Sequence, residues 1–372
     1  MASRALPQAR ARMPARPAPG RSQPSARAIV VGIGHYPRYG AGGTAENDLK
    51  GPELDATMMA EWLVEQEKAH VTLITSSGRS GQRGSRNKKW KVTDMRPRLE
   101  DVQAPLNGFM VDSIDAVQKG GKSRLANRLY VYMAGHGYMP EPNHLALVTT
   151  ESINPGFIQS IQATSWVDWF AEQHHFDEIV LWMDCCAERN YLQPSSKPLQ
   201  PATPARQGRA KMFVAFAAKP SLQAYEAPID PDGPVRGIFT ARLLDALAGA
   251  ATDETGMVTS TSIIGHLSGE GLVGEEAVES TAGTAHAEHY FPGRDLIVFG
   301  PGKLPKYVLK VPLADGAKVK ITRGPVLPVA TRVVAGGAVK VGLGTGYYKA
   351  EAPGFSRLFE IAAGSATDVD LS

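Results

Sequence analysis

A regular alternation of short apolar runs with amphipathic stretches, from residue 27 to residue 300, is the feature that most constrains how this chain folds. The apolar runs have the length and β-branched content of buried strands, and the stretches between them place apolar residues at helical spacing. We expect strands at 27–36, 70–76, 127–137, 178–190, 212–219 and 294–300, and helices at 54–67, 163–176 and 237–250. Residues 93–120 are expected to be helical only in part, because Pro97 and Pro105 interrupt the pattern. Since strands that alternate with helices are typical of a mostly parallel sheet covered on both faces, the sequence predicts an α/β fold.

Both ends of the chain differ in composition from this central part. Residues 1–26 combine arginine, proline and alanine with almost no large apolar residue, so we expect a disordered basic tail that cannot repay the entropy of ordering. Residues 304–372 contain short alternating segments with glycine turns, which predicts a separate small β domain. With "GTGYYKAEAPG" after a hydrophobic strand, this part resembles the small PEGA-like sandwich domains. The central domain then covers 27–300, with a proline-rich exposed linker at 190–211.

Composition argues against several classes of protein. No run of about 18 apolar residues is present to span a bilayer, and the N-terminus lacks the apolar region of a secretory signal, so we expect no membrane association. The only cysteines, Cys185 and Cys186, are adjacent, which indicates a reducing, cytoplasmic compartment rather than a disulfide framework. The arginine-rich tail lacks interleaved aromatic residues, so we expect no specific nucleic-acid partner. The histidines at 174–175 and within 286–289 lack further ligands at metal spacing, so we expect no metal site.

Reactive side chains lie where two of the expected strands end. His136 stands between two glycines at the end of the strand at 127–137, and Cys185 and Cys186 follow the apolar part of the stretch 178–190. Ligands of open α/β sheets bind beyond the carboxyl ends of the strands, so neighbouring strands would bring the histidine and a thiol together there. A histidine that removes the thiol proton creates the thiolate, which is the nucleophile. The pattern therefore predicts a cysteine nucleophile with a histidine base.

The motifs around these residues resemble those of the caspase-like cysteine peptidases. "YVYMAGHG" is followed 50 residues later by "VLWMDCCAE", which is similar to the GHG histidine and D-[SC]-C cysteine of the metacaspase-like and bacterial branch. "AIVVGIGHYP", "LKGPELDATMMAEWL" and "FAAKPSLQAYE…GIFTARLLDAL" resemble, in order, the first strand, the next helix and the segment after the linker. The resemblance spans residues 28 to about 300 and implies a caspase-like, mostly parallel six-stranded sheet with helices on both faces. One departure is "CAERN", where metacaspases usually continue with His-Ser-Gly.

The resemblance assigns the catalytic positions. The nucleophile of the family is the third residue of D-x-C, which is Cys186, and strand alternation directs Cys185 to the opposite side. His136 is then the general base. The N–H groups of Gly137 and of Cys186 itself are the expected donors of an oxyanion hole.

Two acids are expected to set the specificity. Asp184 lies two residues before Cys186, on the same side of the strand, and in the metacaspase-like branch this acid lines the primary specificity pocket. Glu226 falls where the family often has a second pocket acid. Each has a simpler interpretation, Asp184 as a helix N-cap and Glu226 as an ordinary exposed glutamate. As pocket acids they predict cleavage after arginine or lysine, whereas acidic specificity would need an arginine, for which Arg38 is the candidate.

The linker falls where caspases are cut between their large and small subunits, which implies a latent enzyme that processing activates. Arg206, Arg209 and Lys211 are the candidate sites, either for the enzyme itself or for an upstream activating protease. We thus expect a cysteine endopeptidase acting on protein or peptide substrates in a regulated cell-death or defence pathway. The alternatives are a catalytically weak caspase-like scaffold that binds partners, and a peptidase of acidic specificity. We expect no cofactor, because no acidic cluster here has the spacing of a calcium-binding loop, and we leave open the calcium dependence that occurs among metacaspases.

Overall fold

The protein is described by a computed structural model. The described residues are 26–41, 44–76, 79–83, 91–92, 97–120, 123–154, 156–191, 193–199, 208–229, 233–253, 256–268, 278–280, 283–285, 289–302, 306–323, 327–343, 346–361 and 366–372. The basic tail that we expected at 1–26 lies outside these residues, apart from Ala26.

Among the described residues, eight strands form the main sheet, in the order β16-β10-β9-β5-β1-β2-β3-β4. Their bounds are Ala26–Gly32 (β1), His70–Thr75 (β2), Arg79–Arg83 (β3), Lys91–Val92 (β4), Ala126–Ala134 (β5), Phe176–Asp184 (β9), Lys211–Phe216 (β10) and Tyr290–Arg294 (β16). The strands β2, β1, β5, β9 and β10 run parallel, and β16 runs antiparallel to β10. The predicted α/β fold with a mostly parallel sheet is confirmed, and β3 and β4 extend the expected six strands at one edge.

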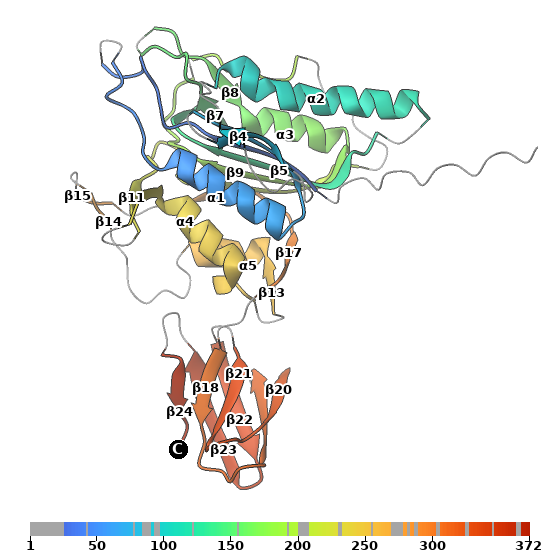
Figure 1. Ribbon diagram of the computed structural model, residues 1–372, viewed down its shortest axis with the longest axis vertical. Coiled ribbons are helices and arrows are strands. Elements are labelled where there is room, and N and C mark those ends of the chain that lie inside the picture. Colours follow the sequence, from blue (N-terminus) through green and yellow to red (C-terminus); the bar gives the residue numbers. More distant parts are fainter. Residues whose placement is uncertain are drawn as a thin grey trace, which may run out of the picture.

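Helices cover both faces of this sheet (Figure 1). Their bounds are Pro52–Glu65 (α1), Leu99–Gln118 (α2), Ala163–Glu172 (α3), Ile238–Asp245 (α4) and Ser260–Leu267 (α5), with a π-helical turn at Ala246–Ala250. One core lies under α2 and α3, and a second core lies under α1, α4 and α5. The sheet strands contribute alternate residues to the two cores, as in β9, where Leu181 faces the first and Trp182 the second.

Short sheets flank the main sheet or belong to the end of the chain. The bounds of their strands are Gly137–Glu141 (β6), His144–Val148 (β7), Ser160–Gln162 (β8), Glu226–Pro228 (β11), Val235–Gly237 (β12), Met257–Thr259 (β13), Val278–Ser280 (β14), Gly283–Ala285 (β15) and Val298–Pro301 (β17). The strands β6, β7 and β8 form one antiparallel sheet, and β11 pairs with β12. Both of these small sheets lie next to the carboxyl edge of the main sheet, because Gly137 of β6 follows the last residue of β5 by three residues and Gly237 of β12 lies against Asp184 at the end of β9.

The helix α2 continues through Pro105, where we expected an interruption. A proline inside a helix costs about 3 kcal/mol, through one lost backbone hydrogen bond and a steric clash. The helix buries Val102, Leu106 and Phe109 in the first core, and each such side chain contributes about 1.5–3 kcal/mol. Burial therefore outweighs the proline at this position.

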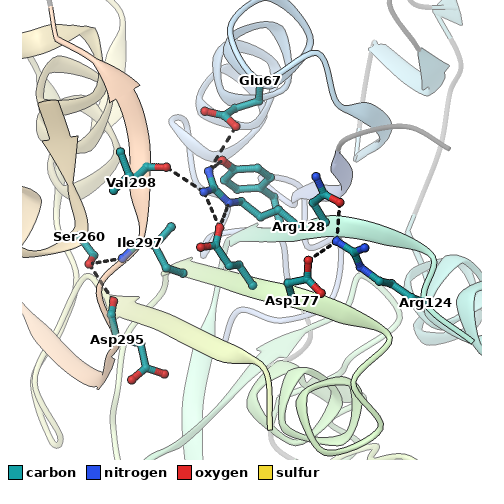
Figure 2. A network of polar contacts seen from close by, with 11 residues as sticks. Glu67, Arg124, Arg128, Asp177, Ser260, Asp295, Ile297 and Val298 are labelled. Carbon is teal, nitrogen blue, oxygen red and sulfur yellow. Dashed lines mark hydrogen bonds and ion pairs between the residues drawn. The ribbon is translucent and has the colours of Figure 1, made fainter. Parts of the chain in front are cut away.

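The last strand of the main sheet also differs from our expectation of a strand at 294–300. The sheet ends with β16, and the chain then leaves it, so that β17 pairs with β13 in a separate two-stranded sheet. Asp295 holds this change of direction, because its carboxylate accepts the N–H of Met212. Its carbonyl also accepts the Ser260 hydroxyl (Figure 2). The apolar pattern of "LIVF" predicts a continuous strand and does not reveal that the pairing of β16 with β10 ends just before Asp295.

Charged side chains close the amino edge of the main sheet (Figure 2). Arg128, near the start of β5, donates to the Glu178 carboxylate on β9 at 2.5 and 2.8 Å and to Glu67 beyond the end of α1 at 3.3 Å. The guanidinium also donates to the Val298 carbonyl at 2.8 Å. One cation therefore ties together two strands of the sheet, the end of a helix and β17.

Residues 306–372 fold around a core of their own. Their strands are Lys306–Lys310 (β18), Lys318–Arg323 (β19), Leu327–Val333 (β20), Ala338–Gly342 (β21), Gly346–Ala352 (β22), Phe355–Ile361 (β23) and Asp368–Asp370 (β24). They form a three-stranded sheet, β21-β18-β24, and a four-stranded sheet, β20-β19-β22-β23. The two sheets share one apolar cluster that includes Leu309, Ile321 and Tyr348, which is the layout of a small sandwich. Across the described ranges, no helix has the length and apolar character that crossing a membrane requires.

Candidate active site

A pocket opens at the carboxyl edge of the main sheet, beyond the ends of β5 and β9. Its cavity volume is about 80 Å³, and its lining includes His136, Cys186 and the three acidic residues Asp55, Asp184 and Glu226. These residues come from α1, from the ends of β5 and β9, and from β11. The structure therefore brings together four residues that we selected from the sequence, and adds Asp55, which we did not.

The two adjacent thiols have different surroundings. Cys185 is 1% exposed and belongs to the core beneath α2 and α3, where its thiol donates to the Met133 carbonyl at 3.7 Å. Cys186 is partly exposed and lines the pocket, with its thiol 4.0 Å from the Ala224 carbonyl. Burial raises the pKa of both thiols. Only Cys186 is therefore open to a ligand in the pocket.

Gly137 lies directly against this pair of cysteines. A side chain at Gly137 would place its Cβ 2.6 Å from the Cβ of Cys185, so the close packing requires glycine. The N–H of Val148 donates at 2.9 Å to the carbonyl of His136, the residue before β6. This bond flanks the pair Gly137 and Leu147, as in a non-hydrogen-bonded pair, in which the N–H points away from the partner strand.

The ring of His136 is held in one orientation. Its Nε2 lies 2.6 Å from the backbone carbonyl of Asn47, in the loop between β1 and α1. Because a carbonyl only accepts hydrogen bonds, Nε2 carries the proton and Nδ1 keeps its lone pair. Burial lowers the pKa of His136 more than the bond to Asn47 raises it. The ring is therefore neutral at pH 7 and has a free basic nitrogen.

Asp184 is the last residue of β9 and is only 8% exposed. Its Oδ2 accepts hydrogen bonds from the hydroxyl of Thr240 at 2.6 Å and from the N–H of Thr240 at 3.2 Å, in the first turn of α4. The carboxylate thus accepts hydrogen bonds at the start of a helix, as an N-cap residue would, but Thr240 of that helix lies 56 residues further along the chain. Burial raises the pKa of Asp184 to about 7, and the hydrogen bonds from Thr240 reduce this effect only in part.

Asp55 is the residue that sequence reasoning missed. Its carboxylate accepts Nε–H of Arg236 at 2.6 Å and the N–H of Gly237 at 2.7 Å. A Cβ on Gly237 would lie 2.1 Å from Oδ2 of Asp184 and 3.2 Å from Oδ2 of Asp55, so the bare glycine lets the two carboxylates approach. Burial raises the pKa of Asp55, and the charge of Arg236 opposes this shift. The sequence did contain one signal for this residue, because Asp55 lies four residues before Met59 and therefore on the same, buried face of α1.

Glu226 begins β11 and reaches the start of α1. Its carboxylate accepts the N–H of Lys50 at 3.0 Å and the N–H of Gly51 at 2.9 Å, which are donors just before the first helical residue. An anion at this end of the helix is stabilising, so the residue is not an ordinary exposed glutamate. In the described part of the chain, no group of three His, Cys, Asp or Glu side chains is arranged to hold a metal ion.

The three candidate processing sites have different positions. Lys211 is the first residue of β10, in the ladder with β9. Arg209 forms ion pairs with Asp168 and Glu172 of α3. Arg206 lies outside the described residues. The bonds after Arg209 and Lys211 therefore belong to backbone that is already held by α3 and β9.

Arg38, the candidate for acidic specificity, does not line the pocket. It borders a separate depression together with Arg98 and Glu151, near the start of α2. Among the described residues, the lining of the pocket that contains Cys186 has acidic side chains and no arginine.

Comparisons with known proteins give structural matches only. No family model matches the sequence, and no curated protein matches it. One similar solved structure is caspase-1 from Spodoptera frugiperda, with 12% identity and a TM-score of 0.44, covering 79% of this chain and 98% of that chain. Another is the Arg-specific cysteine proteinase gingipain R of Porphyromonas gingivalis, with 11% identity and a TM-score of 0.31, covering 91% of this chain and 67% of that chain. At TM-scores this low the matches carry no argument about function, which rests on the site.

Proposed function

We propose that the chain is a caspase-like cysteine endopeptidase that hydrolyses peptide bonds after arginine or lysine. The observation that carries this proposal is the pocket at the carboxyl edge of the sheet, where His136 and Cys186 meet the carboxylates of Asp55, Asp184 and Glu226. A nucleophile and a base beside an anionic pocket suit an enzyme that binds a cationic side chain next to the bond it cleaves.

Cys186 and His136 would perform the chemistry as a pair. The Cys186 sulfur attacks the carbonyl carbon of the substrate, and its proton passes to Nδ1 of His136, which the bond from Nε2 to Asn47 leaves free. The imidazolium then gives this proton to the leaving amine as the C–N bond breaks, and a thioester remains on the enzyme. Water hydrolyses the thioester and restores the thiol. The N–H groups of Gly137 and Cys186 are the proposed donors to the negatively charged oxygen that forms in both steps.

The acids of the pocket would select the substrate. Asp184 has no ion-pair partner within the described ranges, and its buried carboxylate can therefore gain a charge-assisted hydrogen bond from an incoming guanidinium or ammonium group. Asp55 is partly neutralised by Arg236, so it contributes less to the charge of the pocket. Glu226 lies at the rim near Lys50 and adds negative potential. The location of Arg38 outside the pocket argues against acidic specificity.

We also propose that the enzyme is latent until the linker is cut. The raised pKa of Cys186 and the lowered pKa of His136 keep both groups neutral at rest, which supports low reactivity before substrate binds. Of the three candidate positions, Arg206 is preferred, because the backbone after Arg209 and Lys211 is engaged in secondary structure or hydrogen bonds to α3. The motif resemblance supports a role in regulated cell death or defence, with self-processing or an upstream protease as the activating event.

Fluorogenic peptides with arginine, lysine or aspartate before the scissile bond test this proposal. We expect cleavage after arginine and lysine, complete loss of activity in Cys186→Ala, and retained activity in the matched variant Cys185→Ala. Cleavage after aspartate alone would refute the assignment of the pocket. No cleavage by linker-cut protein would refute the enzyme and favour a caspase-like scaffold.

A further inference from the structure

We propose that Tyr36 and Asp48 are positioning residues that set the orientation and tautomer of His136. This inference rests on the proposed peptidase function and extends it to the loop between β1 and α1. Three hydrogen bonds and the peptide bond between Asn47 and Asp48 form a closed path: the Asp48 carboxylate accepts the N–H of Tyr36, the Tyr36 hydroxyl accepts the N–H of His136, and the ring of His136 bonds to the Asn47 carbonyl.

Tyr36 holds the backbone of the histidine. Its side chain is completely buried, and its hydroxyl accepts the N–H of His136 at 2.9 Å and donates to the Val148 carbonyl at 3.3 Å. The two rings also pack together, with centroids 4.7 Å apart. Gly135 leaves room for this hydroxyl, because a Cβ at that position would lie 2.5 Å from it. The tyrosine thus fixes where the histidine leaves the end of β5.

Asp48 holds the tyrosine and the neighbouring backbone. Its Oδ1 accepts the N–H of Tyr36 at 2.6 Å, and its Oδ2 lies 2.7 Å from Nδ1 of His35. Burial acts to raise the pKa of Asp48, but the hydrogen bonds from Tyr36 and His35 outweigh it and lower that pKa, so the carboxylate stays charged at neutral pH. The hydrogen bonds of Asp48 therefore bring the end of the loop back to Tyr36, which lies 12 residues earlier in the chain.

Asn47 joins the two parts of this path. It precedes Asp48, so the bonds that hold Asp48 also determine where the Asn47 carbonyl lies relative to Nε2 of His136. Backbone bonds on both sides support the same arrangement, from Asp48 to Ala45 and from Leu49 to Gly34. Loss of either positioning side chain would leave the ring free to exchange its two neutral tautomers, and only the one protonated on Nε2 has a basic Nδ1.

Substitutions of Tyr36 and Asp48 test this role. We expect Tyr36→Phe and Asp48→Ala to lower kcat for arginine peptides roughly tenfold to a hundredfold with KM unchanged, because the base is misplaced while the acidic pocket is intact. Asp48→Asn should fall between these variants and the wild type, since its amide oxygen can still accept the N–H of Tyr36. Tyr138→Phe is the matched control. It removes a buried hydroxyl that bonds to Ser160 outside the site, and it should leave kcat unchanged.

Ring ¹⁵N spectra give a readout that does not depend on activity. We expect His136 to show a single tautomer with the proton on Nε2 in the wild type and in Tyr138→Phe, and a mixture of tautomers in Tyr36→Phe and Asp48→Ala. Thermal unfolding shows that each variant is folded, and Asp48→Asn replaces Asp48→Ala if the latter is not. If kcat and the tautomer of His136 stay as in the wild type in Tyr36→Phe and the Asp48 variant, the proposal is wrong. If the wild type cleaves no peptide, the peptidase assignment fails, while the spectra still decide the positioning role.

Discussion

Two groups of acidic residues, Glu67 and Glu178 at the amino edge of the main sheet and Asp184 at the carboxyl edge, differ in whether a cation lies beside them. At the amino edge, Arg128 lies between Glu67 and Glu178, so the carboxylates share a guanidinium (Figure 2). At the carboxyl edge, Asp184 is more deeply buried than either of these acids, yet hydrogen bonds from Thr240 are its polar contacts in the described part of the chain. Its pKa is accordingly raised to about 7.

Because of this difference, the paired carboxylates contribute to stability, whereas the unpaired one can contribute to binding. A buried carboxylate with a cation beside it has already made its strongest interaction, and it offers little to a ligand. A buried carboxylate without one carries an electrostatic cost in the folded protein, which an incoming cation can offset. Glu67 and Glu178 therefore serve the fold, whereas Asp184 retains unused interaction free energy, which a basic side chain of the substrate would use in the proposed function.

Among the substitutions proposed at the two edges, removing the cation of the amino edge should cost the most stability. Arg128→Ala leaves Glu67 and Glu178 without their partner in a place where the arginine side chain is 13% exposed, and we expect a loss of roughly 3 kcal/mol in the free energy of unfolding. Denaturant titration measures this loss. The control is Arg124→Ala, which removes the exposed pair with Asp177 and should cost less than about 1 kcal/mol. Equal losses in the two variants would contradict the comparison of the edges.

In contrast to Arg128→Ala, removing the charge of Asp184 should impair the cleavage of substrate rather than the stability of the protein. Asp184→Asn is expected to lower kcat/KM for arginine peptides roughly a hundredfold, because a charge-assisted hydrogen bond to the substrate is lost. Asp177→Asn, at the other end of the same strand, is the matched control and should keep full activity. An Asp184→Asn enzyme with normal kcat/KM for arginine peptides would remove Asp184 from the specificity pocket.

Binding of arginine substrates should depend on pH through Asp184. The substrate guanidinium stays charged, whereas Asp184 gains its charge as the pH rises through about 7, so KM should fall roughly tenfold between pH 6 and pH 8. Initial rates over this range measure the change. The dependence should disappear in Asp184→Asn, and a KM that rises with pH in the wild type would contradict the assignment.

The same group should make stability depend on pH in the other direction. Folding raises the pKa of Asp184 from its ordinary value of 3.8 to about 7, so its contribution to stability is fully present below pH 3.8 and is lost as the pH rises through about 7. A shift of this size corresponds to roughly 4 kcal/mol. Denaturant titrations at pH 5 and pH 8 should show a smaller difference in Asp184→Asn than in the wild type, and equal differences would show that the carboxyl edge carries no such cost.

The smallest effect is expected at Glu226. Glu226→Gln keeps an oxygen for the N–H groups of Lys50 and Gly51 but loses the charge at the end of α1, so we expect a few-fold higher KM and a loss of about 0.5–1 kcal/mol in stability. Kinetics and denaturant titration measure the two changes. Glu100→Gln, in the exposed first turn of α2, controls for the general effect of removing an acid near a helix start. A higher KM in both variants would point to the net charge of the protein rather than to the pocket.

The parts of the site that could be predicted from the sequence are those that depend on strand order and side-chain alternation. His136 and Cys186 end neighbouring parallel strands, and such ends always meet at one edge. Asp184 shares a side with Cys186 because strand residues alternate with a period of two. These relations hold within one or two elements, so a local pattern reveals them.

The remaining parts depend on contacts between distant segments. Asp55 reaches the pocket because Gly237, 182 residues away, has no side chain, and no pattern near Asp55 carries that information. The Asn47 carbonyl is a backbone group, which every residue type provides, so it leaves no signal in the sequence. Pro105 within α2 and the early end of β16 have the same origin, since burial and polar contacts from elsewhere outweigh the local preference in both.

The pairing of β9 with β10 has a consequence for a cut chain. The two strands lie on opposite sides of the linker and are joined along six residue pairs, while Ser196, before the proposed cut, bonds to the backbone of Ser160 and Gln162. A protein cleaved after Arg206 would therefore run as two bands on a denaturing gel but elute from a sizing column as one particle. Activation would change the number of polypeptides without changing the hydrodynamic radius.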